Sequence, residues 1–205
     1  MSHAILRHPF TASLAGPSGC GKTQFTLKLL ERKFEMINPT PSRIVWCYGI
    51  FQRQFSEVKG VEFREGVPKM DEFDGVSRTL LVLDDLMHEV NDEVSRLFTK
   101  GSHHKNLSVL FLTQNLFRAS RHGRTMNLNT HYLVLFKNPR DASQIAFLSR
   151  QMYPGKGKFL VEAFRDATAK PYGYLFIDLK PETDERLRIR TNIFPDDTNY
   201  VYVCG

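Results

Sequence analysis

Eight residues near the N-terminus have the types and spacing of a phosphate-binding loop. Residues 16–23 read Gly-Pro-Ser-Gly-Cys-Gly-Lys-Thr and fit the pattern G-x-x-x-x-G-K-[ST]. Glycines let such a loop curl so that backbone N–H groups point toward the phosphates of a nucleotide. Lys22 would reach the β- and γ-phosphate oxygens, and the Thr23 hydroxyl would bind Mg²⁺. We expect ATP contacts from the whole loop, which comprises Gly16, Pro17, Ser18, Gly19, Cys20, Gly21, Lys22 and Thr23.

Two successive acids follow an apolar run and are candidates for the metal site and the reaction centre. Residues 79–85 read Thr-Leu-Leu-Val-Leu-Asp-Asp. Carboxylates at the tip of a buried strand are unfavourable unless they are paired, hydrogen-bonded or bound to a metal. Asp84 would hold Mg²⁺ through water, and Asp85 would orient or deprotonate the attacking water. Asp85 could instead be a helix N-cap without a role in chemistry.

A glutamine follows the next apolar run and completes the candidate catalytic set. Residues 107–112 predict a core strand, and Thr113 and Gln114 come directly after it. An amide can donate to a phosphate oxygen and also accept from water, so the contacts of Gln114 would change when the γ-phosphate is removed. We therefore predict catalytic roles for Lys22, Asp85 and Gln114.

The order of apolar runs and helical patterns predicts the scaffold that positions these residues. Strands are expected at residues 11–15, 43–48, 79–83, 107–112 and 131–137, and helices at 22–34, 92–100, 141–152 and 158–169. Residues 173–179 and 187–194 predict a terminal strand pair. This alternation is typical of an α/β fold with a mostly parallel central sheet flanked by helices. Without internal repeats or linker-like segments, residues 1–205 are expected to form a single domain.

The composition excludes several other classes of protein. The chain is 41% hydrophobic with a net charge of +6, and it contains 16 Phe, 7 Tyr and 1 Trp, so it can form a core and is not a disordered tail. No apolar run approaches the roughly 18 residues of a membrane-spanning helix. The first residues contain no signal-peptide core, and three widely spaced cysteines indicate neither a disulfide framework nor a zinc site. An intracellular location is expected.

Four motifs taken together resemble a known family of ATPases. GPSGCGKT, LLVLDD, FTKGSHHKNLSVLFLTQN and NTHYLVLFKNPRD follow one another in the chain. In order and spacing they resemble the genome-packaging ATPases of the FtsK/HerA superfamily, and most of all the poxvirus-type branch of Polinton/Maverick elements and adintoviruses. The resemblance spans roughly residues 9–195. It matches the family motifs at residues 16–23, Asp84, Asp85 and Gln114, although many cellular members have Asp-Glu where this chain has Asp84 and Asp85.

The resemblance also implies partners and a place of action. It implies a P-loop NTPase fold of the ASCE/RecA-like type and a homo-oligomeric ring, a pentamer or a hexamer, that drives double-stranded DNA into a capsid, with a capsid or portal protein as a possible partner. The short apolar runs predict no contact with a membrane. The protein would act in the host nucleus or cytoplasm, at the assembling virion. Family members often carry a trans-acting Arg before the strand that ends in Gln, but residues 100–105 contain none. The possible substitutes are Lys100, Lys105 and Arg140. His103 and His104 could ligate a metal, although adjacent His residues without further spaced ligands are more often surface residues.

An uneven distribution of charge suggests where DNA would bind. Residues 94–140 contain eight Lys or Arg and no Asp or Glu. Within this stretch Arg118, Arg121 and Arg124 recur every third residue and would form a basic stripe on a helix. Contacts with phosphates carry no sequence information, as a motor that must pass any sequence requires. The same residues could instead form a solvated basic loop or a subunit interface.

Two further functions remain open at the level of sequence. A nucleoside-phosphate kinase can share the Gly-Pro-Ser-Gly start of the loop, but it does not need Gln114 beside two acids. A nucleotide-gated module that binds DNA or a capsid protein would hydrolyse little ATP. An ABC-type ATPase is set aside because its Leu-Ser-Gly-Gly-Gln signature is missing.

Overall fold

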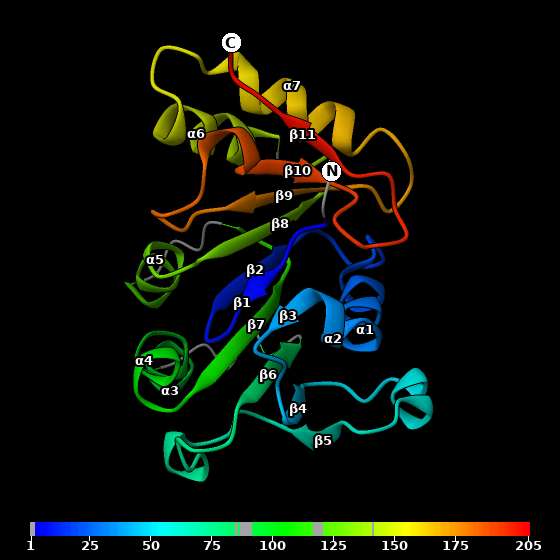
Figure 1. Ribbon diagram of the computed structural model, residues 1–205, viewed down its shortest axis with the longest axis vertical. Helices are drawn as coiled ribbons and strands as arrows, with labels where there is room; N and C mark the ends of the chain where they lie inside the picture. The colour runs from blue at the N-terminus through cyan, green and yellow to red at the C-terminus, as the bar shows by residue number, and fades with distance from the viewer. Residues whose placement is uncertain (1–2, 85, 87–91, 117–120, 141) are drawn as a thin grey trace.

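The chain is organised around a large, mostly parallel sheet. A computed structural model describes residues 3–84, 86, 92–116, 121–140 and 142–205. Among these residues, nine strands pair in the order β11-β10-β9-β8-β2-β7-β6-β4-β5 (Figure 1). Their bounds are β2 Thr11–Ala15, β4 Arg43–Tyr48, β5 Glu62–Glu65, β6 Thr79–Asp84, β7 Leu107–Thr113, β8 Tyr132–Phe136, β9 Tyr174–Asp178, β10 Ile189–Thr191 and β11 Tyr200–Tyr202. A separate small sheet pairs β1 (Leu6–Arg7) with β3 (Ile37–Asn38).

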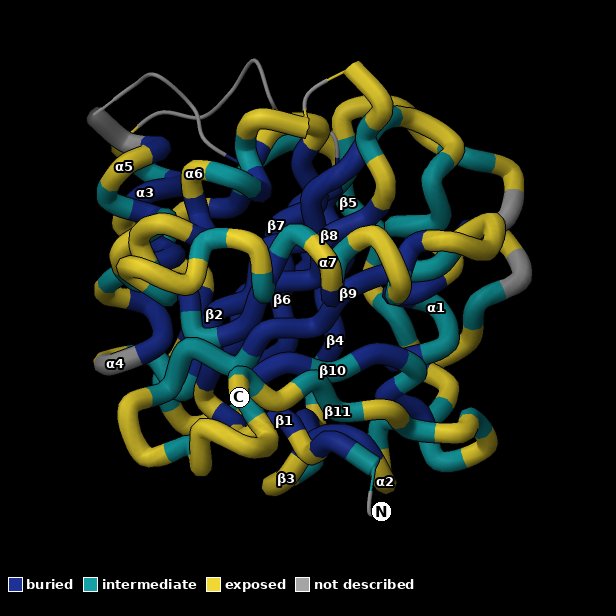
Figure 2. Tube along the Cα trace, turned by 90° about the horizontal axis from the view of Figure 1, so that it is seen from above, coloured by how far each residue is buried: buried dark blue, intermediate teal, exposed yellow. Residues whose placement is uncertain are grey.

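The pairing of the strands confirms the predicted fold class. Strands β5, β4, β6, β7, β2 and β8 all run parallel to one another. From β8 onward the sheet continues antiparallel through β9, β10 and β11. Parallel strands need crossover connections, and these place helices over both faces of the sheet. The continuous apolar runs are therefore central strands, and every residue of β2, β6, β7 and β8 is buried (Figure 2).

Helices cover both faces of the sheet. One face carries α1 (Lys22–Glu31) and α2 (Lys33–Met36), and the other carries α3 (Asp92–Arg96), α4 (Ser102–His104) and α5 (Arg121–Leu128) (Figure 1). Along β6, Leu80 and Val82 pack in the core beneath α1, whereas Leu81 and Leu83 pack with residues of α3. Successive side chains of a strand point to opposite faces, so this one run supplies both cores. The last two helices, α6 (Ser143–Met152) and α7 (Lys158–Ala167), pack on β8 and β9 in a third cluster.

Several predicted bounds differ from those of the structure. The predicted helix over residues 22–34 divides at Arg32 into α1 and α2, because this residue leaves helical geometry with φ −96° and ψ 19°. The predicted helix over residues 92–100 is α3 followed by a π-helical segment, η4 (Leu97–Gly101). The predicted terminal pair is present as β9 and β10, which pair antiparallel, whereas the third strand β11 and the edge strand β5 were missed. Short 3₁₀ turns occur at η1 Arg53–Glu57, η2 Met70–Glu72 and η5 Glu185–Leu187.

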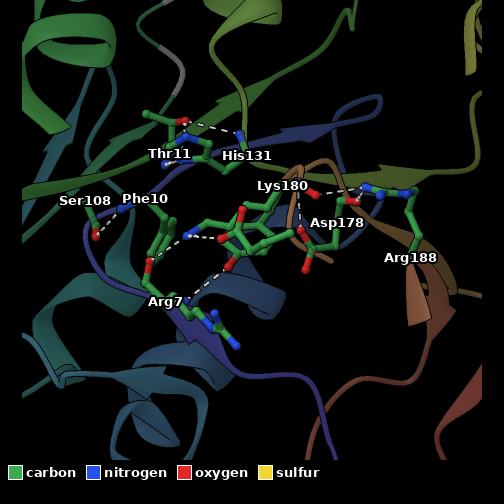
Figure 3. A network of polar contacts seen from close by, with 10 residues as sticks. Arg7, Phe10, Thr11, Ser108, His131, Asp178, Lys180 and Arg188 are labelled. Atoms are coloured by element: carbon green, nitrogen blue, oxygen red, sulfur yellow. Dashed lines mark hydrogen bonds and ion pairs between the residues drawn. The ribbon is translucent and has the colours of Figure 1, made fainter. Parts of the chain in front are cut away.

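Polar contacts fasten the amino ends of the central strands (Figure 3). The backbone N–H of Thr11 donates to Nδ1 of His131 over 3.1 Å, which joins the start of β2 to the segment before β8. The backbone N–H of Phe10 donates to the Ser108 hydroxyl of β7 over 3.0 Å. Because these bonds hold β2 between β7 and β8, they fix the position of the loop that leaves the opposite, carboxyl end of β2.

Among the described residues, no helix combines the length and the apolar character that crossing a membrane requires.

Candidate nucleotide-binding site

A cavity of about 380 Å³ opens at the carboxyl ends of the central parallel strands. This is where ligands bind in open α/β sheets, and the volume lies within the range of small-molecule sites. The cavity lies between the start of α1 and the ends of β6 and β7. It is lined by Ser18, Gly19, Gly21, Lys22, Thr23, Gln24, Gln52, Asp84, Leu112, Thr113, Gln114 and Tyr172.

The loop over residues 16–21 has the backbone conformation of an anion cradle. Gly19 has φ 76° and Gly21 has φ 110°, a region that side chains with a Cβ rarely adopt. Gly16 is required for a different reason, because a Cβ there would lie 2.7 Å from Cys20 Sγ and 2.7 Å from Phe136 Cβ. The N–H of Gly16 donates to the carbonyl of Thr113 over 3.1 Å, which ties the loop to β7. The backbone conformation and the close packing of the loop therefore explain why glycine occupies positions 16, 19 and 21.

Positive charge converges on the cavity from Lys22 and from the start of α1. The Lys22 ammonium donates to the carbonyl oxygens of Gly16 over 2.6 Å and Pro17 over 3.0 Å. An anionic phosphate oxygen is a stronger acceptor than a neutral carbonyl, so a bound nucleotide can draw this ammonium away from the loop. The first turn of α1 contains no acidic residue, so the positive end of the helix dipole is not offset there. These features suit a polyphosphate.

An aromatic cluster holds the first turn of α1 against the sheet. The ring of Phe25 packs edge-on against Phe136 and Tyr174, with centroids 6.2 Å and 4.9 Å away, and it also contacts Phe194. The N–H of Phe25 donates to the carbonyl of Gly21 over 2.8 Å. Because Phe25 is anchored both by its ring and by its backbone, Lys22 and Thr23 start a helix whose position is fixed.

Oxygen ligands suited to Mg²⁺ meet in the same cavity. Asp84 is the last residue of β6 and is 5% exposed, and it pairs in register with Leu112 of β7. Asp84 and Thr23 line one cavity although they are far apart in the sequence. Mg²⁺ binds through one or two carboxylates together with hydroxyl, water and phosphate oxygens. The donors present therefore fit a magnesium ion held between Thr23, Asp84 and a nucleotide.

Gln114 lies where a γ-phosphate sensor is expected, because it follows β7 directly and lines the cavity with Lys22 and Asp84. Replacing Gln114 with Ala is expected to leave ATP binding within about twofold and to reduce the rate of hydrolysis by about 100-fold. Titration with a fluorescent ATP analogue and a phosphate-release assay measure the two effects. Asn115→Ala is the control, because the neighbouring Asn115 does not line the cavity. Equal hydrolysis by both variants would remove Gln114 from the reaction.

Cys20 is a neutral thiol within the loop. Burial raises the pKa of the Cys20 thiol, and this effect exceeds the opposing influence of the Lys22 ammonium, whose Nζ lies 3.9 Å from Cys20 Sγ. Cys20 therefore adds no negative charge to the phosphate cradle. Cys20, Cys47 and Cys204 are all free cysteines.

Some predicted site residues lie outside the cavity or outside the described part of the chain. Asp85 and Arg118 lie outside the described residues, as does the side chain of Arg121, whose backbone begins α5. Arg124 is exposed on α5. None of the possible trans-acting cations lines the cavity. The exposed Lys100 and the half-buried Lys105 precede the amino end of β7, and the exposed Arg140 follows the carboxyl end of β8. The side chain of His103 also lies outside the described residues, and His104 is exposed.

Sequence reasoning missed Gln24, Gln52 and Tyr172, which also line the cavity. Gln52 follows the carboxyl end of β4, so a search for polar residues after each predicted strand could have identified it as a site residue. Gln24 follows the motif by one residue on the predicted helix. Tyr172 comes from the turn before β9, and no motif marks it.

Comparisons with solved structures establish the fold. The DNA-packaging ATPase B204 of Sulfolobus turreted icosahedral virus is 11% identical, with a TM-score of 0.54 over 97% of this chain and 100% of that chain. The genome-packaging NTPase B204 of Sulfolobus turreted icosahedral virus 2, in complex with ATP-gammaS, is 13% identical, with a TM-score of 0.52 over 95% of this chain and 96% of that chain. The cytoplasmic domain of the type VII secretion ATPase EccC of Thermomonospora curvata is 10% identical, with a TM-score of 0.54 over 94% of this chain and 25% of that chain.

At these identities the similarity concerns the fold alone. No family model matches the chain, and no curated protein matches its sequence. The chain has the α/β fold of P-loop NTPases, with additional antiparallel strands at the C-terminal end of the sheet.

Proposed function

We propose that the chain is a P-loop ATPase that uses hydrolysis to move double-stranded DNA, and that it packages a viral or virus-like genome into a capsid. One observation carries the ATPase proposal. Lys22 and Thr23 from α1, Asp84 from β6 and Gln114 after β7 line a single cavity beside a glycine-rich loop. The proposal of DNA packaging rests on the motif resemblance to the FtsK/HerA superfamily. The similarity in fold to B204, itself a DNA-packaging ATPase, supports it.

In this proposal, the residues of the cavity and Asp85 have separate roles in hydrolysis. The loop amides and Lys22 bind the β- and γ-phosphates, and Thr23 and Asp84 hold Mg²⁺, which when bound neutralises charge on those phosphates. Gln114 orients a water for attack on the γ-phosphorus, and Asp85 accepts the proton of that water. The bond between the γ-phosphorus and the bridging oxygen then breaks, which gives ADP and phosphate. The fixed dipoles of the loop amides would strengthen the contacts with the phosphates.

The segment after Gln114 would couple this reaction to DNA. The backbone N–H of Leu116 donates to Oε1 of Gln144 on α6 over 3.0 Å, and the chain continues into α5 with Arg121 and Arg124. A shift of Gln114 on loss of the γ-phosphate would thus be passed to the basic helix that follows in the chain. Arg118, Arg121 and Arg124 would contact DNA phosphates without reading sequence.

Replacing Arg118, Arg121 and Arg124 with Gln is expected to weaken binding to duplex DNA. The slope of log affinity against log salt should fall by about one unit for each DNA phosphate that the variant no longer binds. Fluorescence anisotropy of a labelled duplex over a salt series measures the slope.

The control for this prediction is a triple variant with the same change in net charge. Arg43, Arg64 and Arg186 each pair with a carboxylate, on Glu62, Glu72 and Asp184 respectively. Replacing these three arginines with Gln should leave the salt slope near its original value. Equal slopes for the two triple variants would place the DNA elsewhere on the protein.

Finer parts of the proposal follow from the motif set. We place the chain in the poxvirus-type branch, as one ATPase domain over residues 1–205, acting as a pentameric or hexameric ring in the host nucleus or cytoplasm beside a capsid or portal protein. B204 and EccC support the superfamily and not this branch.

One of the possible trans-acting cations lies at the same end of the parallel strands as the cavity. Arg140 follows the carboxyl end of β8, whereas Lys100 and Lys105 precede the amino end of β7. We therefore favour Arg140 as the cation that reaches the site of a neighbouring subunit.

The proposed function is tested by ATP hydrolysis with and without duplex DNA. A packaging motor should hydrolyse ATP in the presence of Mg²⁺ and should be stimulated by DNA of any sequence. Phosphoryl transfer only when a nucleoside monophosphate is added would identify a kinase instead. Tight ATP binding with almost no turnover would identify a nucleotide-gated binding module.

A further inference from the structure

Tyr172 has a positive φ, a backbone conformation in which Gly or Asn is usually found. Lys170, Pro171, Tyr172 and Gly173 form a β-turn between α7 and β9, closed by the N–H of Gly173 donating to the carbonyl of Lys170 over 3.1 Å. Tyr172 is the third residue of this turn and has φ 61°. A positive φ at this position favours Gly or Asn, and it is an outlier for a bulky side chain. Strain of this kind is concentrated at functional sites.

The ring of Tyr172 lies against the phosphate loop. A Cβ placed on Gly21 would lie 3.3 Å from Cδ1 and 3.5 Å from Cβ of Tyr172, so the loop and the ring are in close contact. Tyr172 is nevertheless 70% exposed, so most of a large aromatic residue is open to solvent beside the loop. Packing into a core does not account for the side chain.

The ring stands between two cavities that meet over the loop. One is the cavity described above, which contains Lys22, Asp84 and Gln114. The other, of about 470 Å³, is formed by loop residues 17–20, Lys137 and residues 168–173. Ser18, Gly19 and Tyr172 line both.

The direction of a bound nucleotide follows from the residues of the first cavity. With its γ-phosphate toward Asp84 and Gln114, the triphosphate leaves its ribose and base on the far side of Gly19 and Gly21. The second cavity opens on that side, with Tyr172 at the boundary. A nucleobase presents a flat face of about the size of a tyrosine ring, and such faces stack on aromatic side chains.

We propose that Tyr172 is the stacking platform for the base of the nucleotide, and that the cavity between residues 17–20 and 168–173 is the base and ribose subsite. This inference rests on the proposed function, because it takes the position of the triphosphate from it. The turn holds the ring beside the loop before binding, so little side-chain freedom is lost when the base stacks.

The test separates binding of the base from binding of the phosphates. Tyr172→Asn removes the ring and retains a residue that tolerates positive φ, whereas Tyr172→Phe retains the ring. We expect Tyr172→Asn to weaken binding of ATP by on the order of tenfold or more. Binding of inorganic tripolyphosphate should be unchanged, and the melting temperature should not fall. Tyr172→Phe should bind ATP like the original chain.

A spectroscopic signature reports stacking directly. The fluorescence of 2-aminopurine riboside triphosphate should be quenched on binding to the original chain and to Tyr172→Phe, and not on saturation of Tyr172→Asn. Tyr200→Asn is the matched control, because Tyr200 is 54% exposed on the edge strand β11 and lines neither of the two cavities.

Three other results would contradict the stacking proposal, and they differ in what they say about the ATPase function. If Tyr172→Asn binds ATP and quenches the probe normally, Tyr172 is not the platform and the proposed ATPase function stands. If this variant also loses tripolyphosphate, its role is to support the loop, and the stacking proposal is wrong. If the original chain binds neither ATP nor tripolyphosphate, both proposals fail together.

Discussion

Lys22→Ala is expected to abolish ATP hydrolysis, with kcat/KM falling by on the order of 1,000-fold. The physical reason is the position of the ammonium at the start of α1, where it donates to the loop carbonyls of Gly16 and Pro17 and lines the cavity with Asp84. In the reaction it would compensate the negative charge that develops on the β- and γ-phosphate oxygens, and Ala cannot replace that charge. Steady-state phosphate release measures the loss, and isothermal titration with ATP measures how much of it is binding.

Lys28→Ala is the matched control because Lys28 lies on the same helix and outside the cavity. Its ammonium pairs with Asp197 at 3.0 Å. Since the two variants remove the same carbon atoms and the same charge, a general effect on α1 would appear in both. Hydrolysis by Lys22→Ala at the rate of Lys28→Ala would show that the loop does not act on a nucleotide.

Asp84→Asn is expected to remove the dependence of ATP binding on Mg²⁺ and to lower hydrolysis by roughly 100-fold or more. The two side chains have nearly the same shape, so the buried end of β6 can keep its packing, while the anionic ligand for the metal is removed. Affinity for ATP should differ between Mg²⁺ and EDTA for the original chain and should be similar in both for Asp84→Asn. Titrations in the two buffers, with hydrolysis measured in parallel, provide the comparison.

Asp178→Asn provides the control for this change. Asp178 also ends a strand, β9, and its carboxylate accepts from the N–H of Lys180 over 3.0 Å. It does not line the cavity, so the same substitution there should leave the Mg²⁺ effect intact. Retention of the full Mg²⁺ effect by Asp84→Asn would assign the metal to other ligands.

The buried strands could be predicted because burial on both faces of the sheet alone determines their amino-acid pattern. Every residue of β6 and β7 is buried, and apart from Asp84 at the end of β6 both strands consist of apolar or small polar side chains, as burial on both faces requires. Edge strands lack this constraint. β5 reads Glu-Phe-Arg-Glu with both ends exposed, and its pairing with β4 depends on backbone contacts that leave little trace in the residue types.

The predicted site residues belong to short sequence patterns, such as a loop motif or the end of an apolar strand. The missed residue Tyr172 is brought to the site only by the tertiary fold. Gly16 to Thr23 are consecutive. Asp84 ends β6 and Gln114 follows β7, and the carboxyl ends of these two parallel neighbours lie side by side. Tyr172 belongs to the turn that leads into β9, and β9 is separated from β2 only by β8. This pairing order brings the turn close to the loop that follows β2. Residue spacing along the chain contains no information about that meeting.

The central claim is that one triphosphate and its Mg²⁺ are held between the loop, Thr23 and Asp84. A crystal structure of the chain with Mg²⁺ and a non-hydrolysable ATP analogue tests it most directly. The account predicts the γ-phosphate within hydrogen-bond distance of Lys22 Nζ, and the metal bound to Thr23 Oγ1 and, directly or through water, to Asp84. A nucleotide bound outside this cavity, or a metal remote from both Thr23 and Asp84, would contradict it.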